Sequence, residues 1–284
     1  MTNGLNLPSR PASRNVSAQA HRVTERMNTC KETGRTAFIP FLVAGDPSLE
    51  ATVAALKALD AAGADVIELG VPYSDPLADG PTIQAAATRA LQQGVILDNV
   101  IDVVRQVSPS ITAPIVMFTY FNPIMARGLD TFCEQISSAG ASGLLVPDIP
   151  LEETAEIREV ASKHGLDLVL LATPTTPAPR MRAIAEATQG FVYLVSVTGV
   201  TGMRGTTETR VEGLIETLRE NTDKSIAVGF GVSGPEQAKQ IKGWGADGVI
   251  VGSALVKALG ESEGGEEGGL KAMEALARSI REAI

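Results

Sequence analysis

A carboxylate lies inside one of the most apolar stretches of this sequence. Glu68 belongs to the run Asp-Val-Ile-Glu-Leu at 65–69, where a charged side chain is costly to bury unless it is protonated or paired. A raised pKa in such surroundings suits a general acid or base. The alternative is a structural role, with Glu68 in an ion pair at the rim of a sheet. Its position in the interior of the run favours the catalytic interpretation.

Two more carboxylates, Asp75 and Asp79, follow Glu68 in a proline-rich segment. The prolines stiffen the segment enough to hold a carboxylate in place, and its length suits a loop that closes over a substrate. Aspartate is also a routine turn and N-cap residue. The spacing alone therefore does not choose between a catalytic and a structural Asp79.

Three glycine-containing turns occur late in the chain, at Thr198–Gly202, Gly229–Ser233 and Gly252–Leu255. Each follows an apolar run of strand length. Backbone N–H groups at such turns, and at the N-terminus of a following helix, bind phosphate, and Ser253 can add its hydroxyl. The alternative is that the glycines only form turns. Two successive turns at the end of the last strands favour a phosphate site.

Other residues that often carry chemistry are not predicted to do so here. His21 lies in the N-terminal segment, and His164 stands before Gly165 at the predicted end of a helix, where its partial charge suits the helix dipole. Cys30 and Cys133 have no metal-ligand spacing, so neither a metal site nor a disulfide framework is expected. No cofactor motif is present, and we expect this chain to bind no cofactor.

Eight short apolar runs supply the strands that position these residues. Each run is continuous rather than alternating, which is typical of parallel strands buried on both faces. Stretches with helical spacing lie between them, for example 49–62, 151–164 and 235–243. The runs are 36–47, 65–72, 114–123, 143–150, 167–174, 191–199, 225–233 and 247–255.

This repeat predicts an α/β fold, a single (β/α)8 TIM barrel over residues 23–284. An N-terminal helix, further helices in loops and a final helix near 270–284 are expected to flank it. The alternative, a doubly wound open sheet, is disfavoured because no strand is followed by a G-x-G-x-x-G turn. The acidic, glycine-rich stretch 261–269 is predicted to be a solvated loop. Barrel chemistry occurs at the C-terminal ends of the strands.

The net charge and the length of the apolar runs exclude some classes of binding partner. A formal net charge of -9 argues against a nucleic-acid surface, and the apolar runs are too short to span a membrane, so a soluble protein is expected. Residues 1–22 contain three arginines and no acidic residue, the composition of a disordered start or of a transit peptide. The expected compartment is the chloroplast stroma for a plant or algal source and the cytoplasm for a bacterial one.

Five segments together resemble the tryptophan synthase alpha family, especially its plant, algal and cyanobacterial members. The resemblance extends from about Val23 to the final helix, and the joint occurrence of the segments in this order is highly specific. They are FIPFLVAGDP at Phe38–Pro47, ELGVPYSDPLADGPTIQ at Glu68–Gln84, FVYLVSVTGVTG at Phe191–Gly202, GFGVSGPEQ at Gly229–Gln237 and VIVGSALVK at Val249–Lys257.

The resemblance implies a carbon–carbon lyase that cleaves indole-3-glycerol phosphate to indole and D-glyceraldehyde 3-phosphate in tryptophan biosynthesis. It implies that Glu68 and Asp79 are the catalytic carboxyl groups, with Glu68 as a proton shuttle and Asp79 as the acceptor from the indole N–H. It assigns phosphate binding to Gly202, Phe230, Gly231, Gly252 and Ser253, and the indole pocket to Phe41, Tyr120, Tyr193 and Phe230.

The resemblance also implies a partner, a beta subunit that receives the indole and holds pyridoxal phosphate, in an alpha2-beta2 complex. The segments Ser74–Pro76 and Phe121–Pro123 resemble those that face this subunit. The segment SVTGVTG, which begins at Ser196, departs from the SRSGVTG of some bacterial members and is similar to that of free-standing plant lyases. A free-standing lyase that releases indole is therefore the alternative to a synthase subunit.

Overall fold

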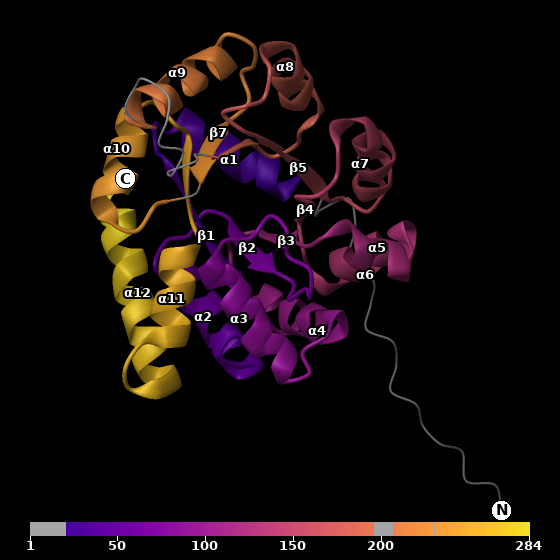
Figure 1. The fold of residues 1–284 in the computed structure, drawn as a ribbon, viewed down its shortest axis with the longest axis vertical. Coiled ribbons are helices and arrows are strands. Elements are labelled where there is room, and N and C mark those ends of the chain that lie inside the picture. Colours follow the sequence, from indigo (N-terminus) through magenta and orange to yellow (C-terminus); the bar gives the residue numbers. More distant parts are fainter. Residues whose placement is uncertain (1–20, 196–206, 230) are drawn as a thin grey trace, which may run out of the picture.

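The computed structural model describes residues 21–195, 207–229 and 231–284. Its centre is a closed barrel of eight parallel strands, each hydrogen-bonded to its neighbours in chain order, with helices around the outside (Figure 1). The strands are β1 (Ala37–Val43), β2 (Ile67–Gly70), β3 (Ile115–Phe118), β4 (Gly143–Leu145), β5 (Asp167–Ala172), β6 (Val192–Val195), β7 (Ile226–Gly229) and β8 (Gly248–Val251).

The strands form because their continuous apolar runs can be buried on both faces, inside the barrel and under the helices. Nearly every strand residue is buried, and β1 closes the barrel by pairing with β8. The predicted (β/α)8 barrel is confirmed, and the open doubly wound sheet is wrong. Each of the eight predicted runs contains one of the observed strands.

Helices follow the strands around the barrel. The predicted N-terminal and loop helices are both present, and the predicted helix ends agree with the observed ones to within a few residues. The helices are α1 (Arg22–Glu32), α2 (Leu49–Ala61), α3 (Pro81–Gln92), α4 (Leu97–Val107), α5 (Phe121–Arg127), α6 (Leu129–Ala139), α7 (Thr154–Lys163), α8 (Ala178–Ala187), α9 (Thr207–Arg219), α10 (Pro235–Gly243), α11 (Ser253–Glu261) and α12 (Gly265–Ala283), with short 3-10 turns at Ser108–Ser110 and Leu151–Glu153.

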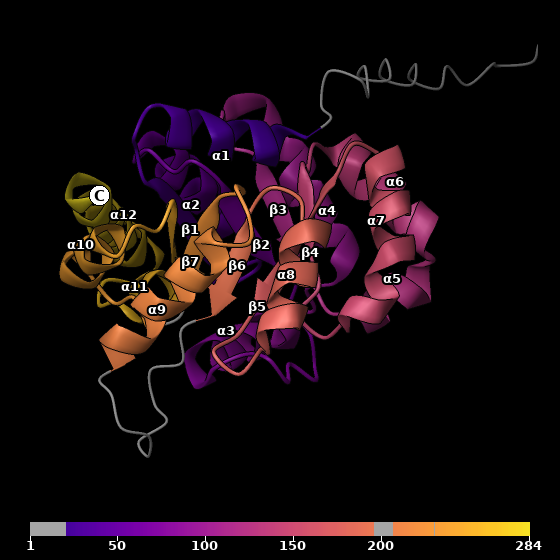
Figure 2. The same cartoon turned by 90° about the horizontal axis from the view of Figure 1, so that it is seen from above.

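Helix α1 closes the N-terminal end of the barrel. Figure 2 shows it on the side of the molecule opposite α3. Its buried Val23 packs against the start of β4, where a Cβ added at Gly143 would lie 3.2 Å from a valine methyl group. Met27 packs against β8 in the same way, 3.3 Å from a Cβ added at Gly248. His21 contributes to the same end through a 2.7 Å contact with Asp167. Within the described residues, α1 therefore covers the N-terminal end of the barrel.

The prediction of a solvated loop at 261–269 is wrong in its second half. Only Ser262–Gly264 connect two helices, and α12 begins at Gly265. Four glycines disfavour a helix by propensity, but close packing overrides that preference. A Cβ at Gly269 would stand 2.0 Å from the carbonyl oxygen of Leu259, so glycine is needed where α12 crosses the end of α11.

Within the described residues, no helix is long and apolar enough to cross a membrane.

Candidate active site

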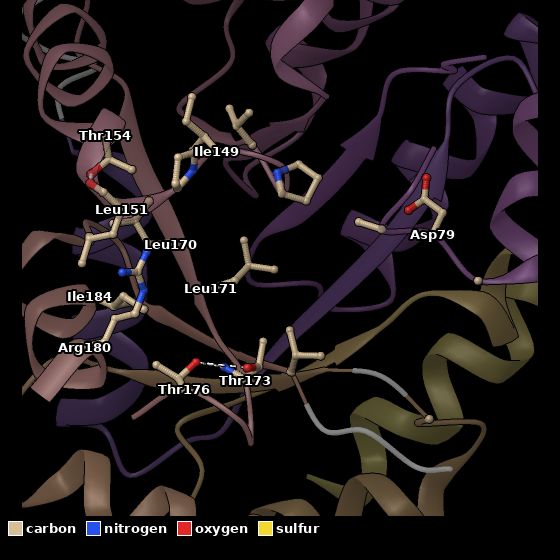
Figure 3. A pocket seen from close by; sticks show the side chains of 17 residues that line it. Asp79, Ile149, Leu151, Thr154, Leu170, Leu171, Thr173, Thr176, Arg180 and Ile184 are labelled. Atoms are coloured by element: carbon tan, nitrogen blue, oxygen red, sulfur yellow. Dashed lines mark hydrogen bonds between the residues drawn. The ribbon is translucent and has the colours of Figure 1, made fainter. Parts of the chain in front are cut away.

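Two cavities open among the loops at the C-terminal end of the barrel. The first, the β4–β5 cavity, has a volume of about 610 Å³ and apolar walls that include Ile149, Leu171 and Ile184. Figure 3 shows Asp79 on the other side of this cavity from Ile184. The second, the β8–α11 cavity, has a volume of about 280 Å³. Asp79 and Gly231 line both cavities, so the two meet at these residues.

Glu68 lies in the middle of β2 and points into the barrel. Its register partner in β1 is Phe41, whose ring lines the β8–α11 cavity. A Cβ at Gly70, two residues along β2, would stand 2.7 Å from that ring. Because side chains alternate between the faces of a strand, Glu68 faces the same side as Gly70. The side chain is fully buried.

Among the residues that the structure describes, none forms a hydrogen bond with either oxygen of the Glu68 carboxyl group. Burial without a partner penalises the charged form and raises the pKa of Glu68 to about 8. The group is therefore mostly protonated at neutral pH and can donate a proton. The ion pair at a barrel rim, the structural alternative for Glu68, is wrong. The carboxyl group lines neither cavity, so it lies behind the cavity wall in this structure.

Asp79 lies in the loop after β2, directly before the Gly80 that precedes α3. Partial burial raises its pKa to about 6, and hydrogen bonding from the Tyr120 hydroxyl opposes that shift. The Tyr120 oxygen also accepts a hydrogen bond of 3.0 Å from the backbone N–H of Ala78. Asp79 is therefore ionised above about pH 6 and can accept a hydrogen bond from a ligand in either cavity.

Three aromatic rings form one wall of the β8–α11 cavity: Phe41, Phe118 and Tyr193. Phe41 and Phe118 pack edge to face with their centroids 5.3 Å apart. Burial raises the pKa of Tyr193 well above its usual value, and the charges of Glu68 and Asp79 raise it further. Both carboxyl groups therefore lie near Tyr193, which connects the buried acid to the cavity. A planar aromatic ligand fits such a wall.

The turns after β7 and β8 also line this cavity. Gly231 has a φ of 80°, which favours glycine, and Gly252 directly precedes α11, whose first residue is Ser253. Val232, Ser233 and Ala254 complete this rim. Two of the predicted phosphate-binding residues, Gly202 and Phe230, lie outside the described residues.

The structure therefore brings Phe41, Asp79, Tyr193, Gly231, Gly252 and Ser253 to one cavity. It places Tyr120 differently from the prediction: Tyr120 lines neither cavity and contacts Asp79 instead. Lys257 was not predicted, although it lines the β8–α11 cavity. The sequence could have indicated Lys257, because it follows Ser253 by four residues and therefore lies on the same face of the helix. The apolar β4–β5 cavity had no sequence signal, because its wall residues come from separate strands and loops.

Within the described part of the chain, no group of three or more His, Cys, Asp or Glu side chains is arranged to hold a metal ion.

The comparisons with known proteins agree on one family. The family model described as "Tryptophan synthase alpha chain" matches residues 27–284. A curated protein of that name from Picosynechococcus sp. is 59% identical over 262 residues, which cover 92% of this chain and 98% of the relative. A protein of the same name from Arabidopsis thaliana is 53% identical over 262 residues, covering 92% and 95% of the two chains.

Solved structures agree with these sequence matches. Tryptophan synthase subunit alpha from Legionella pneumophila superposes with a TM-score of 0.85 at 36% identity, covering 93% of this chain and 98% of the other. A chain of tryptophan synthase from M. tuberculosis, in an aminoacrylate-bound form, gives a TM-score of 0.83 at 35% identity, with coverage of 93% and 100%. The similarity to cyanobacterial and plant members, predicted from the five segments, is confirmed.

Proposed function

The chain belongs to the tryptophan synthase alpha chain family, and from this premise we propose that Glu68 and Asp79 together cleave indole-3-glycerol phosphate. The products are indole and D-glyceraldehyde 3-phosphate. One observation carries the assignment: Glu68 is a fully buried carboxyl group with no hydrogen-bond partner among the described residues, beside a cavity that Asp79 lines. A buried group kept protonated and unpaired is costly to the fold, which a catalytic role explains.

Cleavage of this substrate needs two proton transfers. Indole C3 must gain a proton, and the hydroxyl on the attached carbon must lose one. Glu68, protonated at neutral pH because its pKa is about 8, first donates its proton to C3. Its carboxylate then takes the hydroxyl proton as the carbon–carbon bond breaks and the electron pair returns to the ring. The carboxyl group ends the cycle protonated, as it began.

Asp79 acts on the indole nitrogen. Protonation at C3 places positive charge on that nitrogen, and an ionised carboxylate that accepts the N–H hydrogen bond stabilises it. Asp79 is ionised above about pH 6 and lines both cavities, so it can meet a ligand that spans them. Glu68 must reach the same ligand from behind the wall, and we propose that its side chain rotates toward the β8–α11 cavity when substrate binds.

Other residues of the β8–α11 cavity bind the indole ring and the phosphate group of the substrate. Phe41 and Tyr193 offer their rings to the indole, while Gly231, Gly252 and Ser253 offer backbone N–H groups and the N-terminus of α11 to the phosphate. Gly202 and Phe230 are proposed as further phosphate-binding residues, and Phe230 also as part of the indole pocket. Tyr120 shapes the site through its contact with Asp79. Both proton transfers are assigned to side chains of this chain, so we propose no cofactor for it.

A beta subunit is the proposed partner, in an alpha2-beta2 complex in which the partner holds pyridoxal phosphate. The loop after β2 supports this, because Leu77 is 92% exposed beside the segment Ser74–Pro76. Met125 of α5 is 60% exposed beside Phe121–Pro123. The two segments are connected, since Asn122 donates a 3.1 Å hydrogen bond to the Tyr73 hydroxyl. Because this surface includes the loop that carries Asp79, docking of the beta subunit would affect the position of a catalytic residue.

Residues 1–20 lie outside the described residues, so the chloroplast or cytoplasmic location stays a prediction. Import of a fluorescent protein fused after residues 1–22 into isolated chloroplasts tests it.

Indole release from indole-3-glycerol phosphate by the purified chain tests the proposed reaction. We expect turnover by the wild type and a loss of about 100-fold or more in kcat for Asp79→Asn. Asp102→Asn, on the exposed surface of α4, is the control and should stay within about twofold. No indole from the wild type, with or without a beta subunit, would reject the reaction.

Adding the beta subunit from the same source distinguishes the two kinds of lyase. A synthase subunit should show a higher lyase rate in the complex, because docking favours the closed loop. A free-standing lyase should be near its maximal rate alone and should not respond.

A further inference from the structure

The proposed substrate carries a phosphate dianion, yet the chain has a net charge of -9. Backbone N–H groups and a helix N-terminus carry only partial charges. In addition, Asp79 adds a full negative charge to the β8–α11 cavity. A fixed positive charge at the phosphate end would offset this repulsion and raise the local concentration of the anion.

Among the described residues that line this cavity, Lys257 is the one cation. It lies in α11, four residues after Ser253, and the two side chains therefore project from the same face of the helix one turn apart. A lysine side chain can extend along that turn while its ammonium group stays in water. Lys257 is exposed at the cavity rim, where its charge is available to an entering ligand.

The acidic neighbour that would otherwise neutralise Lys257 pairs with another residue. Glu261, four residues further along α11, contacts Arg89 of α3 at 3.8 Å, and Arg89 also forms two hydrogen bonds with the buried Asp46. Within the described residues, Lys257 forms no ion pair of 4.0 Å or less. Arg89 therefore holds the nearby carboxylates and leaves the charge of Lys257 for a ligand.

We propose that Lys257 is a binding residue for the phosphate dianion of the substrate, which it attracts to the turns after β7 and β8 and helps to hold there. This proposal rests on the proposed function, since it concerns the phosphate of that substrate. It assigns Lys257 to substrate affinity and not to the bond cleavage, because phosphate remains a dianion throughout the reaction. Uniform binding of this kind changes KM and leaves kcat unaltered.

Lys257→Gln tests the proposal, because glutamine keeps most of the length and removes the charge. We expect KM for indole-3-glycerol phosphate to rise about 10-fold, as for loss of one charge-assisted contact, with kcat within about twofold. The dependence of kcat/KM on salt should become weaker. Lys257→Arg should restore most of the affinity. Lys239→Gln, which removes a positive charge from α10 outside the cavity, is the matched control and should behave as the wild type.

A ligand-binding measurement separates this proposal from the proposed reaction. Calorimetry with glycerol 3-phosphate should show about 10-fold weaker binding to Lys257→Gln, whereas binding of uncharged indole should be unchanged. Equal losses for both ligands, or an unchanged KM with an unchanged salt dependence, would overturn the role of Lys257. A wild type that binds glycerol 3-phosphate through Lys257 but releases no indole would reject the reaction and leave the anion site standing.

Discussion

Two buried carboxyl groups three residues apart in the sequence have opposite surroundings. Asp65, just before β2, accepts a 3.0 Å hydrogen bond from the backbone N–H of Phe38 and also contacts Arg35 and Arg281. Glu68, within β2, has no hydrogen-bond partner on either oxygen in the described part of the chain. Both side chains are almost fully buried, at 1% and 0% exposure. Burial alone therefore does not distinguish them.

Whether a buried carboxyl group is hydrogen-bonded depends on its position along the barrel axis. Asp167 and Asp247 resemble Asp65: they also lie at the N-terminal ends of strands, and each accepts a backbone N–H hydrogen bond, from Thr24 and Ile226 respectively. At this closed end every such carboxylate stabilises the fold. Glu68 lies three residues further along toward the open end, and we propose that it is left unpaired so that it can exchange its proton with a ligand. On the proposed function, a buried carboxyl group is therefore structural where it is paired and catalytic where it is left unpaired.

The largest expected effect is the loss of turnover in Glu68→Gln. The amide keeps the shape of the side chain but cannot donate and then recover a proton, so kcat should fall about 1000-fold. Glycerol 3-phosphate affinity should stay nearly the same, because the phosphate turns are separate. Steady-state kinetics and calorimetry measure both values. Substantial residual turnover would show that another group moves the proton.

The converse substitution, Asp65→Asn, should affect stability and not chemistry. It removes a buried carboxylate from partly buried Arg281 and exposed Arg35, which should lower the free energy of unfolding by about 3 kcal/mol. The kcat of the folded protein should be unchanged. Asp102→Asn is the control, since its exposed pair with Arg105 contributes little. Denaturant unfolding gives both values, and an Asp65→Asn protein as stable as the control would contradict the structural role.

The pH dependence of stability should also distinguish the two groups. Because the folded-state pKa of Glu68 is about 8 and its ordinary value is 4.5, the folded protein holds a proton that the unfolded chain has lost. Stability should therefore decrease as pH rises between these values, by ~1.4 kcal/mol per unit. From pH 5.5 to 7.5 the wild type should lose on the order of 2–3 kcal/mol relative to Glu68→Gln. Parallel curves for the two proteins would mean that Glu68 is already ionised when folded.

The smallest expected effect concerns Tyr120. The value of kcat/KM should rise through about pH 6 as Asp79 ionises and fall above about pH 8 as Glu68 loses its proton. Tyr120→Phe removes the hydroxyl that opposes the raised pKa of Asp79, so the acidic limb should move to higher pH. The alkaline limb should stay in place. A shift of both limbs, or of neither, would contradict a specific effect of the Tyr120 hydroxyl on the pKa of Asp79.

The position of Glu68 can be predicted from the sequence, whereas the ion pairs of Asp65 cannot. The eight apolar runs predict the strands, and a carboxylate inside one of them indicates Glu68. The arginines around Asp65 come from positions 30 residues before it and 216 after it. No local pattern shows that they meet.

Asp79, Lys257 and α12 show other limits of a sequence pattern. Turn composition alone left Asp79 undecided, and the family resemblance was needed to select it. Lys257 lies in a helical pattern that also suits a solvated surface residue. The glycines at the start of α12 indicate a loop by propensity, and only the approach of Gly269 to Leu259 explains why they are helical.

The proposed mechanism depends on a protonated Glu68 at neutral pH, and infrared spectroscopy detects this proton. Infrared difference spectra of the wild type against Glu68→Gln, recorded from pH 5 to pH 9, isolate the carboxyl signal of this residue. We expect a protonated carboxyl band that persists at pH 7 and disappears with a midpoint near pH 8. A Glu68 signal that is already that of a carboxylate at pH 6 would contradict it.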